Sequence, residues 1–137
     1  MKKILLVVPA IFALILSACG SAVEPTTNLN VTMTDFVFTP NEFVVPAGQE
    51  ITLHIINNGA VVHNFVIMKL GTTAGETFDE EDQPNVYWEE RDIPPGGDLS
   101  VTFMAPAEPG EYQVVCRTPG HITSGMLGKL IVVAPDQ

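Results

Sequence analysis

The sequence predicts an all-β fold, a Greek-key β-sandwich of seven to eight strands. Several short stretches alternate apolar and polar residues with a period of two, which is the pattern of half-buried strands. The chain of 137 residues holds 11 Gly and 11 Pro, and clusters of such turn-forming residues separate the stretches. The sequence contains no internal repeat and no helical heptad pattern. Short strands with turn signals at intervals are typical of a two-sheet sandwich, and the chain length fits one domain.

The first half of the domain holds five stretches of strand character. They are residues 31–33, 36–38, 43–45, 51–56 and 61–68. The first two stretches are expected to form one strand with an irregularity near Asp35, which keeps the expected total at seven to eight strands. The fourth stretch alternates most clearly, because Ile51, Leu53 and Ile55 fall on one face. The fifth is almost continuously apolar, and its length suits a buried strand better than a helix.

The second half begins with residues 71–83, which are polar and acidic and could form a short helix or a loop. Four further strands are expected, at residues 87–93, 99–103, 112–116 and 127–133. Alternation places Cys116 on the same face as Val114, and His63 on the same face as Phe65. If those apolar residues face the core, Cys116 and His63 both point inward at strand ends.

The N-terminus has the pattern of an export signal. Lys2 and Lys3 precede an uncharged run of 13 residues, 4–16. This run is shorter than the ~20 apolar residues that a membrane-spanning helix needs. Residues 1–18 are therefore expected to be a signal peptide, which is absent from the mature protein.

The signal ends in the sequence Leu-Ser-Ala-Cys-Gly at residues 16–20, which resembles the lipobox of bacterial lipoproteins. By that resemblance, Cys19 is acylated and becomes the new N-terminus, and residues 19–27 tether the domain at 28–137 to a membrane. The alternatives are an ordinary signal peptide with an incidental cysteine, or an N-terminal membrane anchor. Export is expected in each case, to the outer face of the cell membrane or to the periplasm.

The chain has two cysteines, Cys19 and Cys116. Acylation of the first leaves the second without a disulfide partner. A single cysteine in an exported protein is either a reactive thiol or a committed ligand. If Cys116 is a ligand, further ligands are expected among the residues around it.

Cys116, His121 and Met126 have the spacing Cys-x4-His-x4-Met. A Pro-Gly pair and a later Gly can bend this loop, so that all three side chains meet between consecutive strands. His63 is the candidate for a fourth ligand. Two imidazoles and a thiolate, with a distant thioether, form the ligand set of a blue copper site. Zinc also accepts Cys and His, but Met is a poor zinc ligand, so the motif favours one copper ion.

Each of these residues taken alone has a simple structural explanation. A buried cysteine can be inert, a histidine in a strand can be a packed core residue, and a methionine is more often core than ligand. The joint spacing and the all-β pattern favour the metal site. His54 lies in the middle of a strand without such a motif, and we expect that it binds no metal.

The sequence resembles the cupredoxin family over residues 28–133. Three features carry the resemblance: the Cys-x4-His-x4-Met loop, the pair His63-Asn64 upstream, and a Gly-x4-Val ending at 128–133. Both four-residue gaps in the loop are most similar to those of auracyanin and rusticyanin. The resemblance implies one type 1 copper ion, bound equatorially by His63, Cys116 and His121 and axially by Met126.

The resemblance also implies roles for residues around the copper. Asn64 matches a residue that ties the ligand strand to the cysteine loop and so orients the ligands. His121 is expected at the surface, in an apolar ring formed by Pro119, Ile122 and Leu127, where the electron leaves.

The formal net charge is −10, and the mature chain keeps 4 basic and 16 acidic residues. Such a chain cannot neutralise several phosphates, which argues against nucleic-acid binding. Residues 76–92 are rich in acidic side chains and could steer a basic redox partner such as a c-type cytochrome, or could simply be a solvated loop.

A monomeric shuttle of single electrons between membrane redox complexes or cytochromes is the function that these features favour. The alternative is copper delivery or buffering for the assembly of a copper enzyme. An enzyme with several copper sites would need more histidines, because the chain has 3 and His54 alone remains outside the proposed site. We therefore expect that the chain is not an enzyme.

Overall fold

A computed structural model describes residues 23–135 of the chain. These residues form nine strands and one short 3-10 helix, η1. The elements are β1 Asn28–Thr34, β2 Val37–Thr39, β3 Glu42–Pro46, β4 Glu50–Asn57, β5 His63–Met68, η1 Gln83–Asn85, β6 Val86–Ile93, β7 Asp98–Met104, β8 Gly110–Val115 and β9 Leu127–Val133. Among the residues described, no helix is long and apolar enough to cross a membrane.

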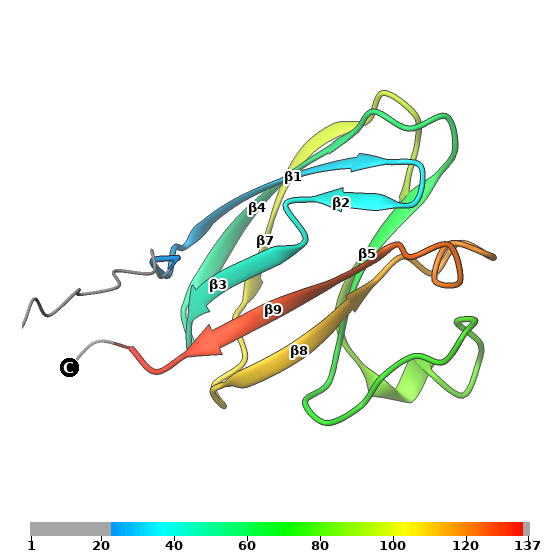
Figure 1. Ribbon diagram of the computed structural model, residues 1–137. Helices are drawn as coiled ribbons and strands as arrows, with labels where there is room; N and C mark the ends of the chain where they lie inside the picture. Colours follow the sequence, from blue (N-terminus) through cyan, green and yellow to red (C-terminus); the bar gives the residue numbers. More distant parts are fainter. Residues whose placement is uncertain (1–22, 136–137) are drawn as a thin grey trace, which may run out of the picture.

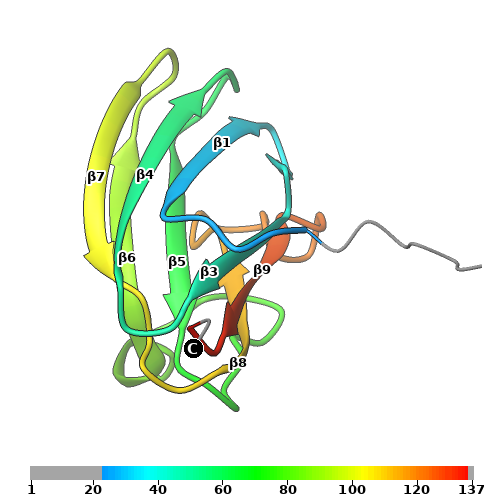
Figure 2. The ribbon, with the colours of Figure 1, turned by 90° about the vertical axis from the view of Figure 1, so that its left-hand side faces the viewer.

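The strands form two sheets, as the sequence predicts for a sandwich. One sheet has the order β2-β1-β4-β7, and the other has the order β3-β9-β8-β5-β6. Most neighbouring strands are antiparallel, but β1 pairs with β4 and β3 pairs with β9 in parallel. In Figure 2, β7, β4 and β1 lie side by side as one layer. The expectation of an all-β sandwich is confirmed.

The core lies between the two sheets and is built from alternate residues of the strands. In β4, Ile51, Leu53 and Ile55 are fully buried, as their period of two predicts. Phe65 of β5 contacts Phe38 and Phe43 edge-on, with ring centroids 5.6 and 5.4 Å apart. This packing holds the strands that carry the candidate ligands.

Two elements differ from the expectations. The number of strands exceeds seven to eight, because the irregularity near Asp35 separates the three-residue strand β2 from β1. β5 begins at His63 rather than at residue 61, because Val61 and Val62 lie in the preceding loop and are exposed. Residues 71–83 were expected to form a short helix or a loop. Residues 71–82 form a loop, and Gln83 begins η1.

The loops that matter for function gather at one end of the sandwich. The β1–β2 turn, the loop before β5 and the β8–β9 loop lie at the same end in Figure 1. The described chain begins and ends at the opposite end, where Pro25 and Thr26 line the same surface hollow as Ala134 and Pro135.

The expected signal peptide and Cys19 lie outside the described residues. Of the expected tether, Thr26 and Thr27 already contact the sandwich: Thr26 N–H donates to the Val44 carbonyl at 3.0 Å, and Thr52 N–H donates to the Thr27 carbonyl at 2.8 Å.

Candidate metal centre

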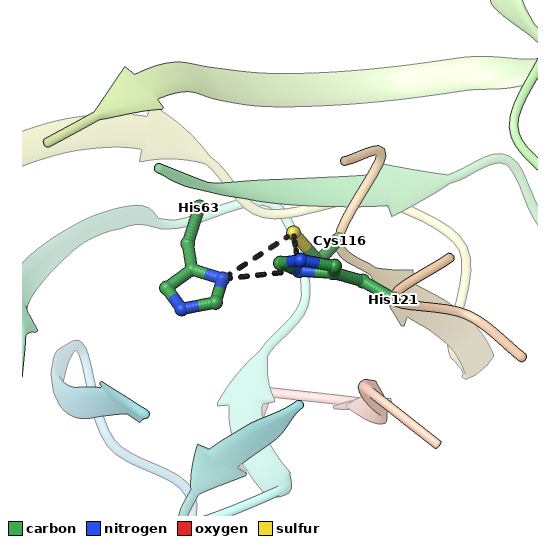
Figure 3. A group of neighbouring side chains, drawn as sticks. All are labelled: His63, Cys116 and His121. Atoms are coloured by element: carbon green, nitrogen blue, oxygen red, sulfur yellow. Dashed lines mark hydrogen bonds between the residues drawn. The ribbon is translucent and has the colours of Figure 1, made fainter. Parts of the chain in front are cut away.

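Three of the four predicted ligands converge in the structure. His63 is the first residue of β5, Cys116 directly follows β8, and His121 lies in the loop between β8 and β9. One donor atom from each lies within 4.8 Å of the other two, and all three residues are buried. Figure 3 shows the two imidazole rings and the Cys116 sulfur turned toward one another.

The distances between the donor atoms fit a metal ion. His63 Nδ1 lies 3.2 Å from His121 Nδ1, and Cys116 Sγ lies 3.8 and 3.4 Å from these two nitrogens. A point equidistant from the three atoms in their plane is about 2.0 Å from each, close to the ~2.0–2.1 Å bond between a metal and an imidazole. Two imidazoles and one thiolate in a trigonal arrangement form the equatorial donor set of a blue copper site.

The β8–β9 loop brings Met126 next to these donors through its backbone. Met126 N–H donates to the His121 carbonyl at 2.9 Å, and Cys116 N–H donates to the Met126 carbonyl at 3.4 Å. Gly120 and Gly125 have φ angles of +82° and +93°, which are conformations that glycine adopts without steric cost. Met126 is fully buried and belongs to the core cluster that includes Cys116.

Asn64 connects the His63 strand to the cysteine loop. Its backbone N–H lies 3.4 Å from Cys116 Sγ, and its side-chain amide donates to Thr118 Oγ1 at 2.9 Å. Its side-chain oxygen accepts a hydrogen bond from Asp92 N–H at 3.1 Å. The Thr118 hydroxyl in turn donates to the Val62 carbonyl at 3.0 Å. Asn64 is therefore placed where it can orient both Cys116 and its own neighbour in β5, His63.

The burial of His121 differs from the expectation that it lies at the surface. Its exposed fraction is 4%, because the ring of Phe36 packs against it edge-on, with centroids 5.1 Å apart. Ile122 is also buried, in a small cluster with Val66 and Val115, and so does not contribute to a surface ring. Leu127 is exposed, as expected.

Exposed apolar side chains nevertheless gather in the loops at this end of the molecule. Eight large apolar residues are exposed within residues 23–135, and five of them lie in or beside the three loops of the candidate site. We call these five the apolar rim: Phe36, Val37, Val61, Val62 and Leu127.

Sequence reasoning missed Asn57, which shapes the loop before His63. Asn57 is fully buried, and its amide donates to the carbonyls of Val61 and Ile93 at 2.9 Å each. Its side-chain oxygen accepts the Gly59 N–H at 2.8 Å. An Asn-Asn-Gly sequence signals a turn, but it does not indicate that the first amide turns into the core.

Sequence reasoning also missed Asp35 and Phe36, which form the turn between β1 and β2. Asp35 Oδ1 lies 3.2 Å from His63 Nε2, the ring nitrogen that faces away from Cys116. Phe36 has a φ angle of +71°, which is uncommon for a residue other than glycine. This turn therefore contacts both imidazoles, and the expected irregularity near Asp35 was the one signal of it in the sequence.

Burial keeps both imidazoles neutral, which is the form that binds metal. Burial lowers the pKa of His63 below its usual value of 6.5, and the neighbouring Asp35 only partly opposes this. Burial also lowers the pKa of His121, and so does the nearby His63. The two Nδ1 atoms can thus accept a metal ion at neutral pH.

His54 lies apart from the cluster. Its Nε2 is 2.6 Å from Asp98 Oδ1 on the outer face of the β4–β7 pair, and the Asp98 side chain is 64% exposed. The metal-ligand group found within residues 23–135 comprises His63, Cys116 and His121, without His54.

The family model described as a Cupredoxin-like domain matches residues 6–132 of the chain. The chain belongs to the cupredoxin family. The cluster of His63, Cys116, His121 and Met126 is accordingly consistent with one type 1 copper site.

Solved and curated proteins are similar to this cupredoxin. Reduced auracyanin from Roseiflexus castenholzii is 30% identical, with a TM-score of 0.68 over 80% of this chain and 99% of that chain. Plastocyanin from Hordeum vulgare is 34% identical over 113 residues, which cover 82% of this chain and 65% of that protein. The copper-resistant cuproprotein CopI from Rubrivivax gelatinosus is 28% identical over 121 residues, which cover 82% of this chain and 70% of that protein. Plastocyanins and auracyanins are non-enzymatic blue copper proteins, in agreement with the expectation that this cupredoxin is not an enzyme.

Proposed function

We propose that this cupredoxin carries single electrons on one copper ion held by His63, Cys116, His121 and Met126. Copper bound there would supply a centre that changes between Cu(I) and Cu(II). Sulfur donors suit Cu(I), and imidazole donors suit Cu(II). The observation that carries the proposal is the convergence of three buried donor atoms within 4.8 Å. The backbone hydrogen bonds of the β8–β9 loop and the contacts of Asn64 support a donor geometry that changes little between the two oxidation states.

The apolar rim is the surface that we propose for contact with redox partners. It lies over the donor cluster, and Phe36 within it is 43% exposed while its ring touches His121. Apolar side chains can approach a partner closely without a large desolvation cost. The electron would then leave through His121 and its immediate neighbours.

The exposed carboxylates of the protein favour a basic redox partner, and we propose a c-type cytochrome. The four most exposed carboxylates of the β5–β6 loop are Glu76, Asp79, Glu80 and Glu81. These carboxylates, together with the negative net charge of the whole chain, would steer a positively charged protein toward the molecule during encounter.

We further propose that acylated Cys19 anchors this protein at the outer face of the cell membrane or within the periplasm, as a monomer. The lipobox-like sequence at 16–20 supports this proposal. The fold supports it as well, because the described chain begins at the end of the sandwich that lies opposite the apolar rim. An anchor at that end would leave the rim free to meet partners.

The copper proposal is tested by titrating the purified protein with Cu(II) and recording its visible spectrum. We expect one equivalent to bind with the intense blue colour of a thiolate–Cu(II) bond. Cys116→Ser should abolish the colour, and His121→Ala should weaken binding, whereas His54→Ala is the matched control and should change neither. A blue colour that survives in Cys116→Ser would refute the ligand assignment.

The electron-transfer proposal is tested by mixing the reduced protein with an oxidised c-type cytochrome in a stopped-flow instrument. We expect rapid, one-to-one reduction of the cytochrome that ends with a blue protein. No reduction, despite intact copper binding, would contradict the proposed shuttle.

The anchor is tested by fractionating cells that produce the full chain or its Cys19→Ser variant. The wild type should sediment with membranes, and the variant should appear in the soluble exported fraction. The same distribution for both proteins would contradict lipid anchoring through Cys19.

Copper delivery remains the second candidate function, and the similarity to CopI favours it. Complete burial of His63 and Cys116 opposes it, because a delivery protein has to release its ion readily. The copper-loaded protein is mixed with a copper-free acceptor enzyme, and copper transfer is followed by the loss of blue colour. Transfer that is faster than electron transfer to a cytochrome would favour delivery over the shuttle.

A further inference from the structure

The imidazole of His63 lies between a carboxylate and the donor cluster. Its Nδ1 faces Cys116 Sγ and His121 Nδ1, at 3.8 and 3.2 Å. Its Nε2, on the other side of the ring, lies 3.2 Å from Asp35 Oδ1. Because Asp35 is an acceptor, a proton on Nε2 is held there and Nδ1 keeps its lone pair for a metal.

The position of Asp35 is fixed by the backbone of the loop that precedes His63. The Ala60 N–H donates to both carboxylate oxygens of Asp35, at 3.0 and 3.2 Å. Two elements distant in sequence, the β1–β2 turn and the loop before β5, therefore fix the same carboxylate. The His63 ring is completely buried, whereas the Asp35 side chain is 36% exposed.

Gly59 provides the space in which this contact forms. A Cβ atom added at Gly59 would lie 2.6 Å from His63 Nε2 and would also collide with Asp35 Oδ1. Any larger residue would therefore separate the carboxylate from the ring. Gly59 is itself held by the buried side chain of Asn57, which accepts the Gly59 N–H at 2.8 Å. Gly59 and the Ala60 N–H thus hold the Asp35 carboxylate in place against the His63 ring.

We infer that Asp35 is a positioning residue that orients His63 and lowers the reduction potential of the copper site by stabilising its oxidised form. This inference rests on the proposed copper function. A hydrogen bond from Nε2 to a carboxylate makes the opposite nitrogen a stronger electron donor. A negative charge near the ion also favours Cu(II), which carries one more positive charge than Cu(I). Partial exposure of Asp35 to solvent moderates this charge effect without removing it.

The test replaces Asp35 by Asn, which keeps the shape and an oxygen acceptor but removes the charge. We expect the affinity for Cu(II) to fall by about 10–100-fold, the range for partners of metal ligands, and the affinity for Cu(I) to fall less. A tenfold selective loss of Cu(II) affinity raises the reduction potential by about 59 mV. Asp35→Asn should therefore bind copper, remain blue and be reduced at a higher potential than the wild type.

Asp98→Asn is the matched control. Asp98 also contacts a histidine ring nitrogen, Nε2 of His54, at 2.6 Å, but this pair is not part of the donor cluster. Removal of its charge should leave the reduction potential unchanged. A potential that rises equally in both variants would overturn the inference, because the effect would then come from net charge alone.

A second measurement uses the copper-free protein and does not depend on redox chemistry. Nitrogen-15 NMR of the His63 ring should show the proton on Nε2 in the wild type, and a mixture of both tautomers in Asp35→Ala. The same single tautomer in both proteins would overturn the positioning role of Asp35.

The two proposals fail in distinguishable ways. A wild-type protein that does not become blue with copper contradicts the proposed function. A blue Asp35→Asn variant with the potential of the wild type contradicts the role of Asp35 alone.

Discussion

The three histidines of this chain differ in what their ring nitrogens face. His54 lies on the outer face of a sheet and contacts the exposed carboxylate of Asp98. His63 and His121 are buried, and each directs Nδ1 toward the other and toward Cys116. This difference separates a surface ion pair from a candidate metal ligand, although all three residues have the same chemistry in isolation.

Met126→Leu should raise the reduction potential while copper stays bound. The axial ligand of a blue copper site tunes the potential, whereas the thiolate and imidazoles hold the ion. Leu and Met have similar volumes, so the substitution should cost less than about 1.5 kcal/mol of stability. Protein-film voltammetry of the copper-loaded variant measures the shift.

The matched control for this substitution is Met68→Leu. Met68 is equally buried, but it lies at the end of β5 distant from His63, in the small cluster with Val66. Its replacement should leave the potential unchanged. A Met126→Leu protein with the wild-type potential would mean that Met126 is not an axial ligand.

Three of the four candidate donors could be predicted from their spacing because they lie close together in the sequence. Cys116, His121 and Met126 lie in one loop, so their spacing alone indicates that they can meet. Asp35 could not be predicted in the same way, since it meets His63 across 28 residues and through a turn. The hydrophobic pattern carries no information about such a contact, because Asp35 is polar and partly exposed.

Among the elements, the strands could be predicted, but their partners could not. A period of two shows that β4 has a buried face, yet it does not show that β4 lies between β1 and β7. The parallel pairs β1–β4 and β3–β9 join strands that are not consecutive in the chain. Such long-range pairing has no signature within any single stretch.

The β6 strand is linked to the cysteine loop through Arg117. Arg117 Nη1 donates to Glu89 Oε2 at 2.9 Å and to Gln83 Oε1 at 3.0 Å. Its guanidinium group also lies 4.5 Å from the centroid of the Phe78 ring. The residue directly after Cys116 therefore fixes the acidic β5–β6 loop against the body of the molecule.

This link predicts a pH dependence of stability. Burial would raise the pKa of Glu89, but hydrogen bonds from Arg91, Gln83 and Arg117 outweigh it and lower the pKa below the usual 4.5. A carboxylate with a lowered pKa stabilises the folded state above about pH 4.5, and this contribution disappears as the pH falls through the lower, folded-state pKa. Glu89→Gln should therefore cost about 1–3 kcal/mol at pH 6 and much less at about pH 3.

Urea unfolding of the copper-free wild type and variant at both pH values measures this difference. Copper-free protein is used because metal binding also releases protons. Glu111→Gln is the control, since Glu111 lies in an exposed pair with Lys129 and should change stability by less than about 1 kcal/mol. A deficit of Glu89→Gln that stays the same at both pH values would contradict the assigned ionisation of Glu89.

At the scale of the whole molecule, charge and apolar surface are separated. The apolar rim lies in or beside the three loops of the candidate metal centre, while acidic side chains concentrate in the β5–β6 loop and in β6. With such a distribution, the acidic side chains attract a partner at long range, and the apolar rim makes the short-range contact with it.

The rate of electron transfer to a basic cytochrome should fall steeply as salt is added. Electrostatic steering raises association rates by about 10–10³-fold at low ionic strength, and salt screens it. Stopped-flow rates at increasing NaCl concentrations measure the slope, and an acidic electron acceptor should give the opposite slope. Equal slopes for the two acceptors would contradict steering by the negative net charge of the protein.

The position of β9 in its sheet also determines when the donor atoms can come together during folding. β9 lies between β8 and β3, and it is the last strand of the described chain. β3 and β8 both precede β9 in the chain, so the five-stranded sheet stays open until β9 joins it. A nascent or truncated chain that ends before residue 127 would leave the Cys116 thiol unshielded, without the strand that closes its loop. Copper uptake is therefore expected to be one of the last events in the maturation of this protein.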